Sequence, residues 1–235
     1  DAELSHRQAI KLKPDYAGSY LNLGNLLRDL GRLQEAELSY RKAIEIDSRC
    51  EDAKYNLSLS LLKSNNFKEG FIKYESRWKI LDQYKPLITT KPEWAPTNRG
   101  IVLLWAEQGI GEEIIFASLI PELVKVVDQL IIKIDERLIP LFKRSFDKRI
   151  IYINKNTILE KEAYDFQISM GSLIKYFRTD KESFKKGKKP YLKVVKRKTN
   201  IFRDKILKHS KYKKIVGISW ISKSTTYKYK SISLE

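Results

Sequence analysis

The residues best suited to chemistry lie together in the string EQGIGE at residues 107–112. The carboxylate of Glu112 could act as a general base that takes a proton from a hydroxyl group. Glu107 and Gln108 could hydrogen-bond a polar ligand, or they could pin the loop to a neighbouring strand. Alternatively, Glu112 only complements a helix dipole, and for Glu113 we expect this dipole role or a solvent-facing position.

The elements around this string must be a strand before it and a helix after it. Ile101–Trp105 is an uninterrupted apolar run, which is typical of a strand buried on both faces. Gly109 and Gly111 then permit backbone angles that a side chain would forbid, or the close approach of a ligand. A strand, glycine loop and helix in a parallel sheet place the loop where phosphate or carboxylate ligands usually bind. The apolar positions that predict the inner helix face are Ile114, Ile115, Leu119, Leu123 and Val126.

The composition predicts a folded protein with one large or two ordinary domains. Its 235 residues are 42% hydrophobic and 11% aromatic, which is enough for real cores. No stretch suits a membrane span, and the first residues do not resemble a signal peptide, so we expect a cytoplasmic protein. Cys50 is the single cysteine, and His6 and His209 lie far apart, so we expect no disulfide, no metal site and no cofactor.

The net charge of +17 raises the question of an anionic partner. The positive charge is mostly lysine, scattered along the chain and densest in residues 181–198. This distribution argues against specific nucleic-acid binding. It leaves an acidic partner, a phosphorylated glycan or a peripheral contact with a membrane surface as better alternatives.

The first 80 or so residues contain an internal repeat. When residues 17–50 are aligned with residue 51 onward, similar residue types recur, and the small residues Gly24 and Ala36 fall where two helices would cross closely. The second copy is degenerate, since Arg77 stands where Ala43 is in the first. The 34-residue period and these small residues resemble a tetratricopeptide repeat. The resemblance implies a helical solenoid that docks a peptide or protein, or that serves as a spacer. Residues 2–14 match the second half of an earlier repeat, so we expect further residues before Asp1.

After the repeats, prolines interrupt the helical pattern and the pattern of an α/β fold begins. We expect a linker at residues 83–100, with Trp94 at the seam between the domains. Strands separated by helices predict a Rossmann-like parallel sheet covered on both faces over residues 101–212, and residues 213–235 begin a second such half. The repeats occupy residues 1–82. The predicted strands after the first are residues 129–135, 149–153, 164–169 and 214–220; the helices are 136–146, 170–177 and about 200–209.

These residues also carry a resemblance to a known family. The relevant strings are ESRW at 75–78, PEW at 92–94, LLWAEQGIGE at 103–112, FA at 116–117, VGISW at 216–220 and KSISL at 230–234. In this order they resemble bacterial proteins that join tetratricopeptide repeats to a family-nine, heptosyltransferase-like glycosyltransferase domain. The string from Trp105 to Glu112 is the most distinctive part.

The resemblance implies two facing Rossmann-like halves, with the acceptor held mostly by the first and the nucleotide-sugar donor mostly by the second. In the heptosyltransferases an acidic residue directly after the first-loop glycine serves as the catalytic base. Glu112 occupies that position, where aspartate is usual. The implied substrate-binding residues are Glu107, Gln108, Gly109 and Gly111, and the implied donor-phosphate residues are Ser222 and Lys223.

The resemblance therefore predicts transfer of a sugar from a nucleotide-sugar donor to a glycan or protein acceptor, without a metal, and with the repeats docking a partner or the acceptor. A donor site divided between two halves would be incomplete in these 235 residues, so we expect them to be inactive alone. The alternative is a non-catalytic tetratricopeptide scaffold that binds other proteins.

Overall fold

The structure is a computed structural model that describes residues 2–81, 85–187 and 190–208. The chain forms two compact units, Asp1–Lys193 and Val194–Glu235, which we describe separately. The predicted strand at 214–220 lies outside the described residues, and the predicted domain boundaries at 82, 100 and 212 stay predictions.

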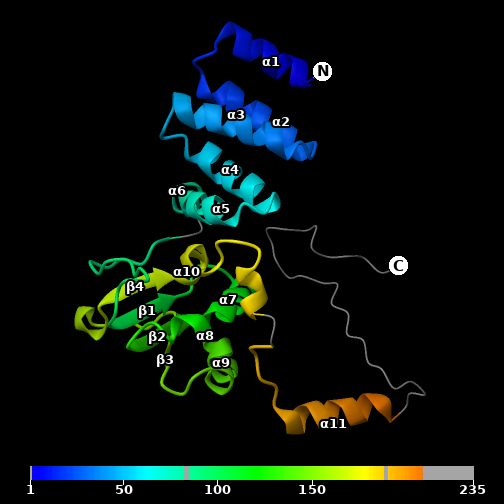
Figure 1. The fold of residues 1–235 in the computed structure, drawn as a ribbon. Helices are drawn as coiled ribbons and strands as arrows, with labels where there is room; N and C mark the ends of the chain where they lie inside the picture. Colours follow the sequence, from blue (N-terminus) through cyan, green and yellow to red (C-terminus); the bar gives the residue numbers. More distant parts are fainter. Residues whose placement is uncertain (1, 82–84, 188–189, 209–235) are drawn as a thin grey trace. The chain divides into compact units, whose positions relative to one another are not determined.

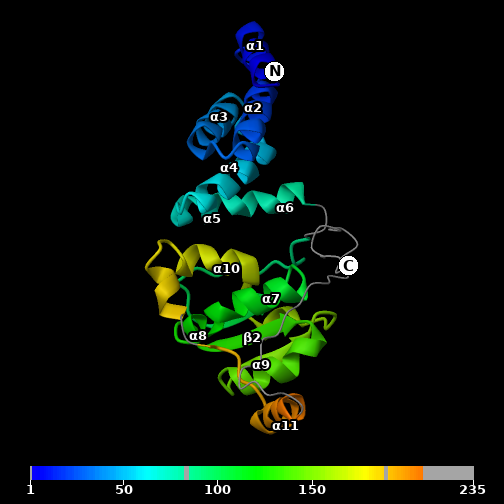
Figure 2. The same ribbon diagram turned by 90° about the vertical axis from the view of Figure 1, so that its right-hand side faces the viewer.

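The first unit begins with antiparallel helices that stack on one another. α2 and α3 lie side by side, and the helices follow one another along the stack in chain order (Figures 1 and 2). Their bounds are α1 Ala2–Leu12, α2 Ala17–Asp29, α3 Leu33–Ile46, α4 Glu51–Lys63, α5 Phe67–Lys73, the 3₁₀ turn η1 Tyr74–Ser76 and α6 Arg77–Ile80. This is the helical repeat region that the period predicted.

The packing explains why small residues recur in the repeat. Tyr40 is fully buried, and its hydroxyl donates a hydrogen bond of 2.9 Å to Oδ1 of Asn25. A Cβ atom on Gly24 would lie 2.6 Å from the Tyr40 ring, so only glycine fits there. Gly31 and Asn65 both have positive φ angles, 78° and 64°, and both close the turn between two helices of a repeat.

The rest of the first unit is built around a parallel sheet with the strand order β3-β2-β1-β4. The strands are β1 Ile101–Trp105, β2 Gln129–Ile134, β3 Ile151–Asn154 and β4 Phe166–Ser169. The helices are α7 Ile110–Phe116, α8 Ile120–Leu123, α9 Ile139–Ser145 and α10 Met170–Phe177, and the 3₁₀ turns are η2 Ala117–Leu119, η3 Glu136–Leu138, η4 Lys161–Ala163 and η5 Ser183–Gly187. The fold class predicted from the sequence, helical repeats followed by a Rossmann-like parallel α/β region, is confirmed.

The two faces of the sheet are covered differently. On the first face, Val102, Leu104 and Ile132 pack against the helices, including Leu123 of α8 and Phe142 of α9. On the second face, Leu103, Ile131 and Tyr164 pack against Leu87 and Leu159, which lie in irregular segments. Among the described residues, helices therefore cover only one face, whereas the alternation of strands and helices predicted cover on both.

The strand order gives the reason for this difference. The steps from β1 to β2 and from β2 to β3 run in one direction across the sheet, so right-handed crossovers place their helices on the same face. The step from β3 to β4 runs back across β2 and β1, and by the same handedness it must cross the opposite face. This return segment, residues 155–165, contains only the turn η4 and no α-helix. It covers the second face as a loop.

Two details of the sequence interpretation were wrong. Ile115 was placed on the inner helix face, but it is 63% exposed. The helical segment after the loop is not one helix but is divided into α7, η2 and α8, which changes the face that each residue presents. Trp94 was placed at the seam between domains, but it is fully buried in the core of the first face against Tyr176 and Phe177 of α10. Its backbone N–H donates to the carbonyl of Gln167 at 2.8 Å, which adds the linker to the edge of β4.

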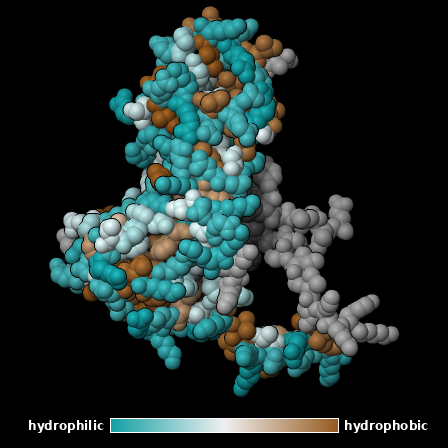
Figure 3. All heavy atoms as spheres, viewed as in Figure 1, coloured by the Kyte–Doolittle hydropathy of each residue, from teal (hydrophilic) through white to brown (hydrophobic). Residues whose placement is uncertain are grey.

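The second unit is described over its first residues, where α11 spans Lys196–Leu207. None of its residues is buried. Hydrophobic side chains are exposed on it, as Figure 3 shows, among them Ile201, Phe202 and Ile206. The basic helix predicted at about 200–209 is thus present, and it starts a few residues earlier.

Candidate functional site

The candidate site lies at the carboxyl ends of the parallel strands, where ligands bind in open α/β sheets. The loop after β1 contains Glu107, Gln108 and Gly109, and α7 follows at once. β3 is followed by Lys155, whose ammonium donates a hydrogen bond of 3.2 Å to the carbonyl of Gln108. The sheet thus brings the end of β3 to the loop that follows β1.

Glu107 is engaged in bonds that hold the loop in place. Its side chain is 1% exposed, and its Oε1 lies 2.8 Å from Nη2 of Arg77, in the last repeat. Its Oε2 accepts a hydrogen bond of 3.2 Å from the backbone N–H of Gly171, in the first turn of α10. A Cβ at Gly171 would collide with the same carboxylate. Of the two roles open to Glu107 in the sequence, this geometry matches the pinning role.

Arg77 is the centre of a buried charge cluster between the repeats and the sheet. Its side chain is fully buried, its Nη1 lies 2.5 Å from Oε1 of Glu75, and its Nη2 donates to the hydroxyls of Ser169 and Ser172 at 3.2 and 2.8 Å. Its guanidinium lies over the ring of Trp78, 4.3 Å from the centroid. Burial alone would lower the pKa of Arg77, but the neighbouring carboxylates outweigh it and raise that pKa.

Glu113 was predicted to face solvent or to complement the helix dipole. It does lie in the first turn of α7, but the predicted solvent-facing position was wrong. Its side chain is 1% exposed. Its Oε2 accepts a hydrogen bond of 3.0 Å from the backbone N–H of Asp135, and its Oε1 lies 2.6 Å from the ammonium of Lys155. Glu113 therefore ties α7 to the residues that follow β2 and β3. Among the described residues, Lys155 is the only one that forms an ion pair with Glu113, and it is distant in sequence.

Glu112, the predicted base, lies in the first turn of α7 and is half-buried. No described residue forms a hydrogen bond or an ion pair with its carboxylate. The explanation of Gly109 and Gly111 by unusual backbone angles was wrong, since Gly109 has φ −78° and ψ 172° and Gly111 is helical. A Cβ at Gly111 would meet open space. The close approach of a ligand stays a prediction for these glycines.

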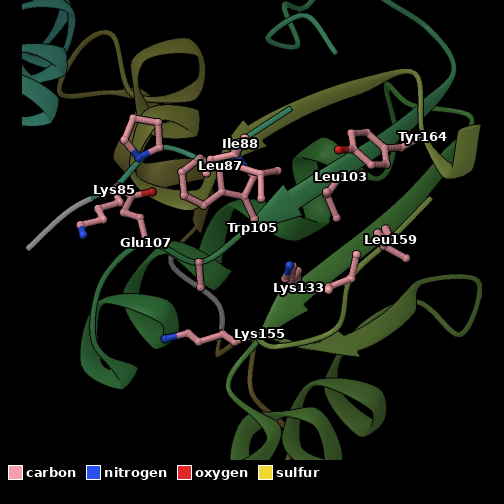
Figure 4. Close-up of a pocket in the computed structure, with 13 residues that line it drawn as sticks. Lys85, Leu87, Ile88, Leu103, Trp105, Glu107, Lys133, Lys155, Leu159 and Tyr164 are labelled. Atoms are coloured by element: carbon pink, nitrogen blue, oxygen red, sulfur yellow. The ribbon is translucent and has the colours of Figure 1, made fainter. Parts of the chain in front are cut away.

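A pocket of about 540 Å³ opens on the second face of the sheet, beside the loop (Figure 4). Trp105 and Lys133 line it from the ends of β1 and β2, and Lys155 lines it from the end of β3. The linker contributes Lys85 to Ile88, and the return segment contributes Ile158 and Leu159. Glu107 also lines the pocket, whereas Glu112 does not.

The sequence interpretation therefore identified part of this region. It placed Glu107 and Gln108 at the carboxyl edge, where the structure has them. It assigned no function to Arg77, Lys133 or Lys155. A signal existed for two of these: Arg77 replaces the small residue of the repeat, and Lys133 interrupts an apolar strand. The predicted donor-phosphate residues Ser222 and Lys223 lie outside the described residues.

The structure defines a protein with helical repeats joined to a parallel α/β region, and comparisons with known proteins identify the repeat. A family model described as tetratricopeptide repeat matches residues 17–50. These residues are a tetratricopeptide repeat, as the period predicted. Repeats of this kind stack into superhelices whose concave surfaces generally bind other proteins.

Other similarities are more distant. Protein FlbA of Caulobacter vibrioides is 24% identical over 206 residues, which is 76% of this chain and 34% of that protein. The human protein O-mannosyl-transferase TMTC3 is 36% identical over 59 residues, covering 25% of this chain and 6% of TMTC3. Among solved structures, a mutant O-GlcNAc transferase of Thermobaculum terrenum aligns with a TM-score of 0.33 and 20% identity, over 56% of this chain and 26% of that one. The chain thus spans about a third of the length of FlbA, and far less of TMTC3.

Within the described ranges, no helix is both long and apolar enough to cross a bilayer.

Proposed function

We propose that the full-length protein is a glycosyltransferase of the heptosyltransferase-like kind, in which this chain supplies tetratricopeptide repeats and the first Rossmann-like half. It would transfer a sugar from a nucleotide-sugar donor to a glycan or protein acceptor in the cytoplasm, without a metal or other cofactor. The order of repeats, linker and parallel sheet supports this proposal, as does the resemblance of residues 103–112 to that family. One relative in the comparison is named a protein O-mannosyl-transferase, which is in line with a protein acceptor.

The observation that carries the proposal is that three carboxylates near the loop after β1 differ in their bonding partners. Glu107 is held by Arg77 and by α10, and Glu113 is held by Lys155 and by a backbone N–H. Of the three carboxylates, only that of Glu112 has no hydrogen bond or ion pair with any described residue. It is therefore the carboxylate that remains available to take a proton.

The chemistry requires one such carboxylate. Inverting transfer forms a bond between the acceptor oxygen and the anomeric carbon of the sugar, while the bond from that carbon to the nucleoside diphosphate breaks. The acceptor hydroxyl loses its proton to Glu112, and the diphosphate leaves with the electron pair of the broken bond. A single base suffices because the diphosphate is already a good leaving group. Gly109 and Gly111 would let the acceptor approach the loop closely.

The test is turnover of a panel of nucleotide-sugar donors by the full-length protein and its Glu112→Gln variant. Loss of a general base lowers the rate by roughly 10²–10⁴-fold, and we expect Glu112→Asp to keep part of the activity. The matched control is Glu162→Gln, because Glu162 is also a glutamate, is exposed and lies outside the pocket. Unchanged transfer by Glu112→Gln would rule out Glu112 as the base.

A second candidate function is a non-catalytic scaffold, favoured by the structural engagement of Glu107. Glu107, a residue predicted to bind substrate, instead forms an ion pair with Arg77 of the last repeat. Such a pair is expected in a scaffold, where it joins the repeats to the sheet. The first repeats also carry a groove of about 380 Å³, whose lining includes Ile10, Lys11, Tyr20 and Leu38. Absence of transfer by the wild-type full-length protein with every donor, together with partner binding lost on substitution in this groove, would favour the scaffold.

A further inference from the structure

The pocket on the second face carries positive charge that no described carboxylate balances. Lys85, Lys133 and Lys155 all line it. Lys155 is paired with Glu113, and the one carboxylate in the lining, Glu107, is paired with Arg77. Within the described ranges, Lys85 and Lys133 form no ion pair. Two of the three ammonium groups are therefore left for an anion from outside.

Lys133 is the more informative of these two because of its position in the sheet. It lies opposite Trp105 in the register of β1 and β2, and it is half-buried. Its alternate neighbour on the same strand face, Ile131, is buried in the core of the second face. A partly buried ammonium group among apolar side chains costs free energy unless an anion pairs with it. An apolar residue is the ordinary occupant of such a position on a sheet face. The lysine at position 133 therefore indicates an anionic ligand.

Apart from the three lysines, Glu107 and Tyr164, the residues that line the pocket are apolar, and two of them are unusually exposed. Leu103 and Leu159 line the pocket within the core cluster of the second face. Ile88 of the linker and Ile158 of the return segment also line it, and their exposed fractions are 101% and 93%. Two isoleucines from segments far apart in sequence thus lie uncovered, among the described residues, beside the same cavity. An apolar ligand body would cover both of them.

We propose that this pocket binds an amphiphilic organic phosphate. The phosphate pairs with the ammonium group of Lys133, with Lys85 adding positive charge to the same lining, and the apolar body packs against Leu159, Ile88 and Ile158. The volume of about 540 Å³ suits a small organic molecule. This site goes beyond the proposed function, because binding here requires neither Glu112 nor sugar transfer.

The test is calorimetric titration of the full-length protein with hexyl phosphate, inorganic phosphate and hexanol as separate probes. We expect saturable binding of hexyl phosphate, and at least about tenfold weaker binding of either inorganic phosphate or hexanol. Lys133→Met should weaken hexyl phosphate about tenfold or more. The matched control is Lys125→Met, which removes the same charge from an exposed lysine outside the pocket.

A second variant guards against a folding defect in Lys133→Met. Ile158 is almost fully exposed, so Ile158→Ser should leave the thermal unfolding midpoint unchanged while weakening hexyl phosphate and not inorganic phosphate. Three results would each overturn the proposal: no saturable binding of hexyl phosphate at millimolar concentration, equal weakening by Lys125→Met, or equal affinity for hexyl phosphate and one of the two partial probes. Equal weakening would mean that the net charge of +17 attracts anions diffusely.

Discussion

Replacing Arg77 by methionine should cost far more stability than an ordinary substitution in a repeat. Methionine keeps an unbranched apolar stem of similar length, so the main loss is the charge with its bonds to Glu75, Glu107 and the two serine hydroxyls. The side chain is fully buried, so the carboxylate of Glu107 would remain in the interior without its cation. Removal of one partner of a buried ion pair typically costs about 3–5 kcal/mol.

For a unit of this size, each kcal/mol corresponds to about 2–4 °C in the unfolding midpoint, so we expect Arg77→Met to lower it by about 6–20 °C. Urea unfolding followed by circular dichroism gives the free energy directly. Arg49→Met is the control, since the side chain of Arg49 is 93% exposed and should change stability by less than about 0.5 kcal/mol.

A double-mutant cycle with Glu107→Gln tests the mechanism rather than only the loss. If the two side chains act as a pair, the double variant should be more stable than the sum of the single effects predicts, by about 1–3 kcal/mol. The reasoning would be refuted by additive effects, or by an Arg77→Met protein within about 1 kcal/mol of the wild type. Either outcome would mean that the guanidinium contributes little beyond its packing.

Two further predictions concern the repeats and their junction with the sheet. Gly24→Ala should destabilise the protein by about 1–3 kcal/mol in urea unfolding, because the new methyl group would overlap the fully buried Tyr40 ring. Burial acts to raise the pKa of Glu75, but Arg77 and Lys175 outweigh it and hold that pKa below its ordinary value of 4.5. The stability contributed by Glu75 is then fully present above about pH 4.5 and is lost as the pH falls through the lowered pKa. Urea midpoints between pH 7 and pH 3 should fall less steeply in Glu75→Gln, and identical slopes would contradict this assignment.

Elements whose signal is local could be predicted from the sequence. The apolar run Ile101–Trp105 coincides with β1, because five consecutive apolar residues are too few for a helix of their own and are typical of a strand buried on both faces. The repeat at 17–50 was predicted from its period, and the close contact of Gly24 with Tyr40 supplies the physical reason for the small residue. The parallel order followed from the alternation of strands and helices.

Features that depend on distant partners could not be predicted in this way. Glu112 and Glu113 are adjacent and chemically identical, yet only the Glu113 side chain is buried. It is buried because its carboxylate pairs with Lys155 and accepts a hydrogen bond from the backbone N–H of Asp135. The sequence left Glu107 open to a ligand, but in the structure its carboxylate accepts a hydrogen bond from Arg77, thirty residues earlier in the chain. Period and propensity carry no information about such pairs.

The buried arginine also limits how the repeats can be exchanged during evolution. Upstream repeats contact only their neighbours in the stack, so copies can be gained or lost there without altering the sheet. The final repeat is different, because it contributes the cation that anchors the loop after β1. A recombination point that preserves the ion pair between Arg77 and Glu107 therefore lies before α4. The last repeat is then inherited together with the α/β region rather than with the repeats that precede it.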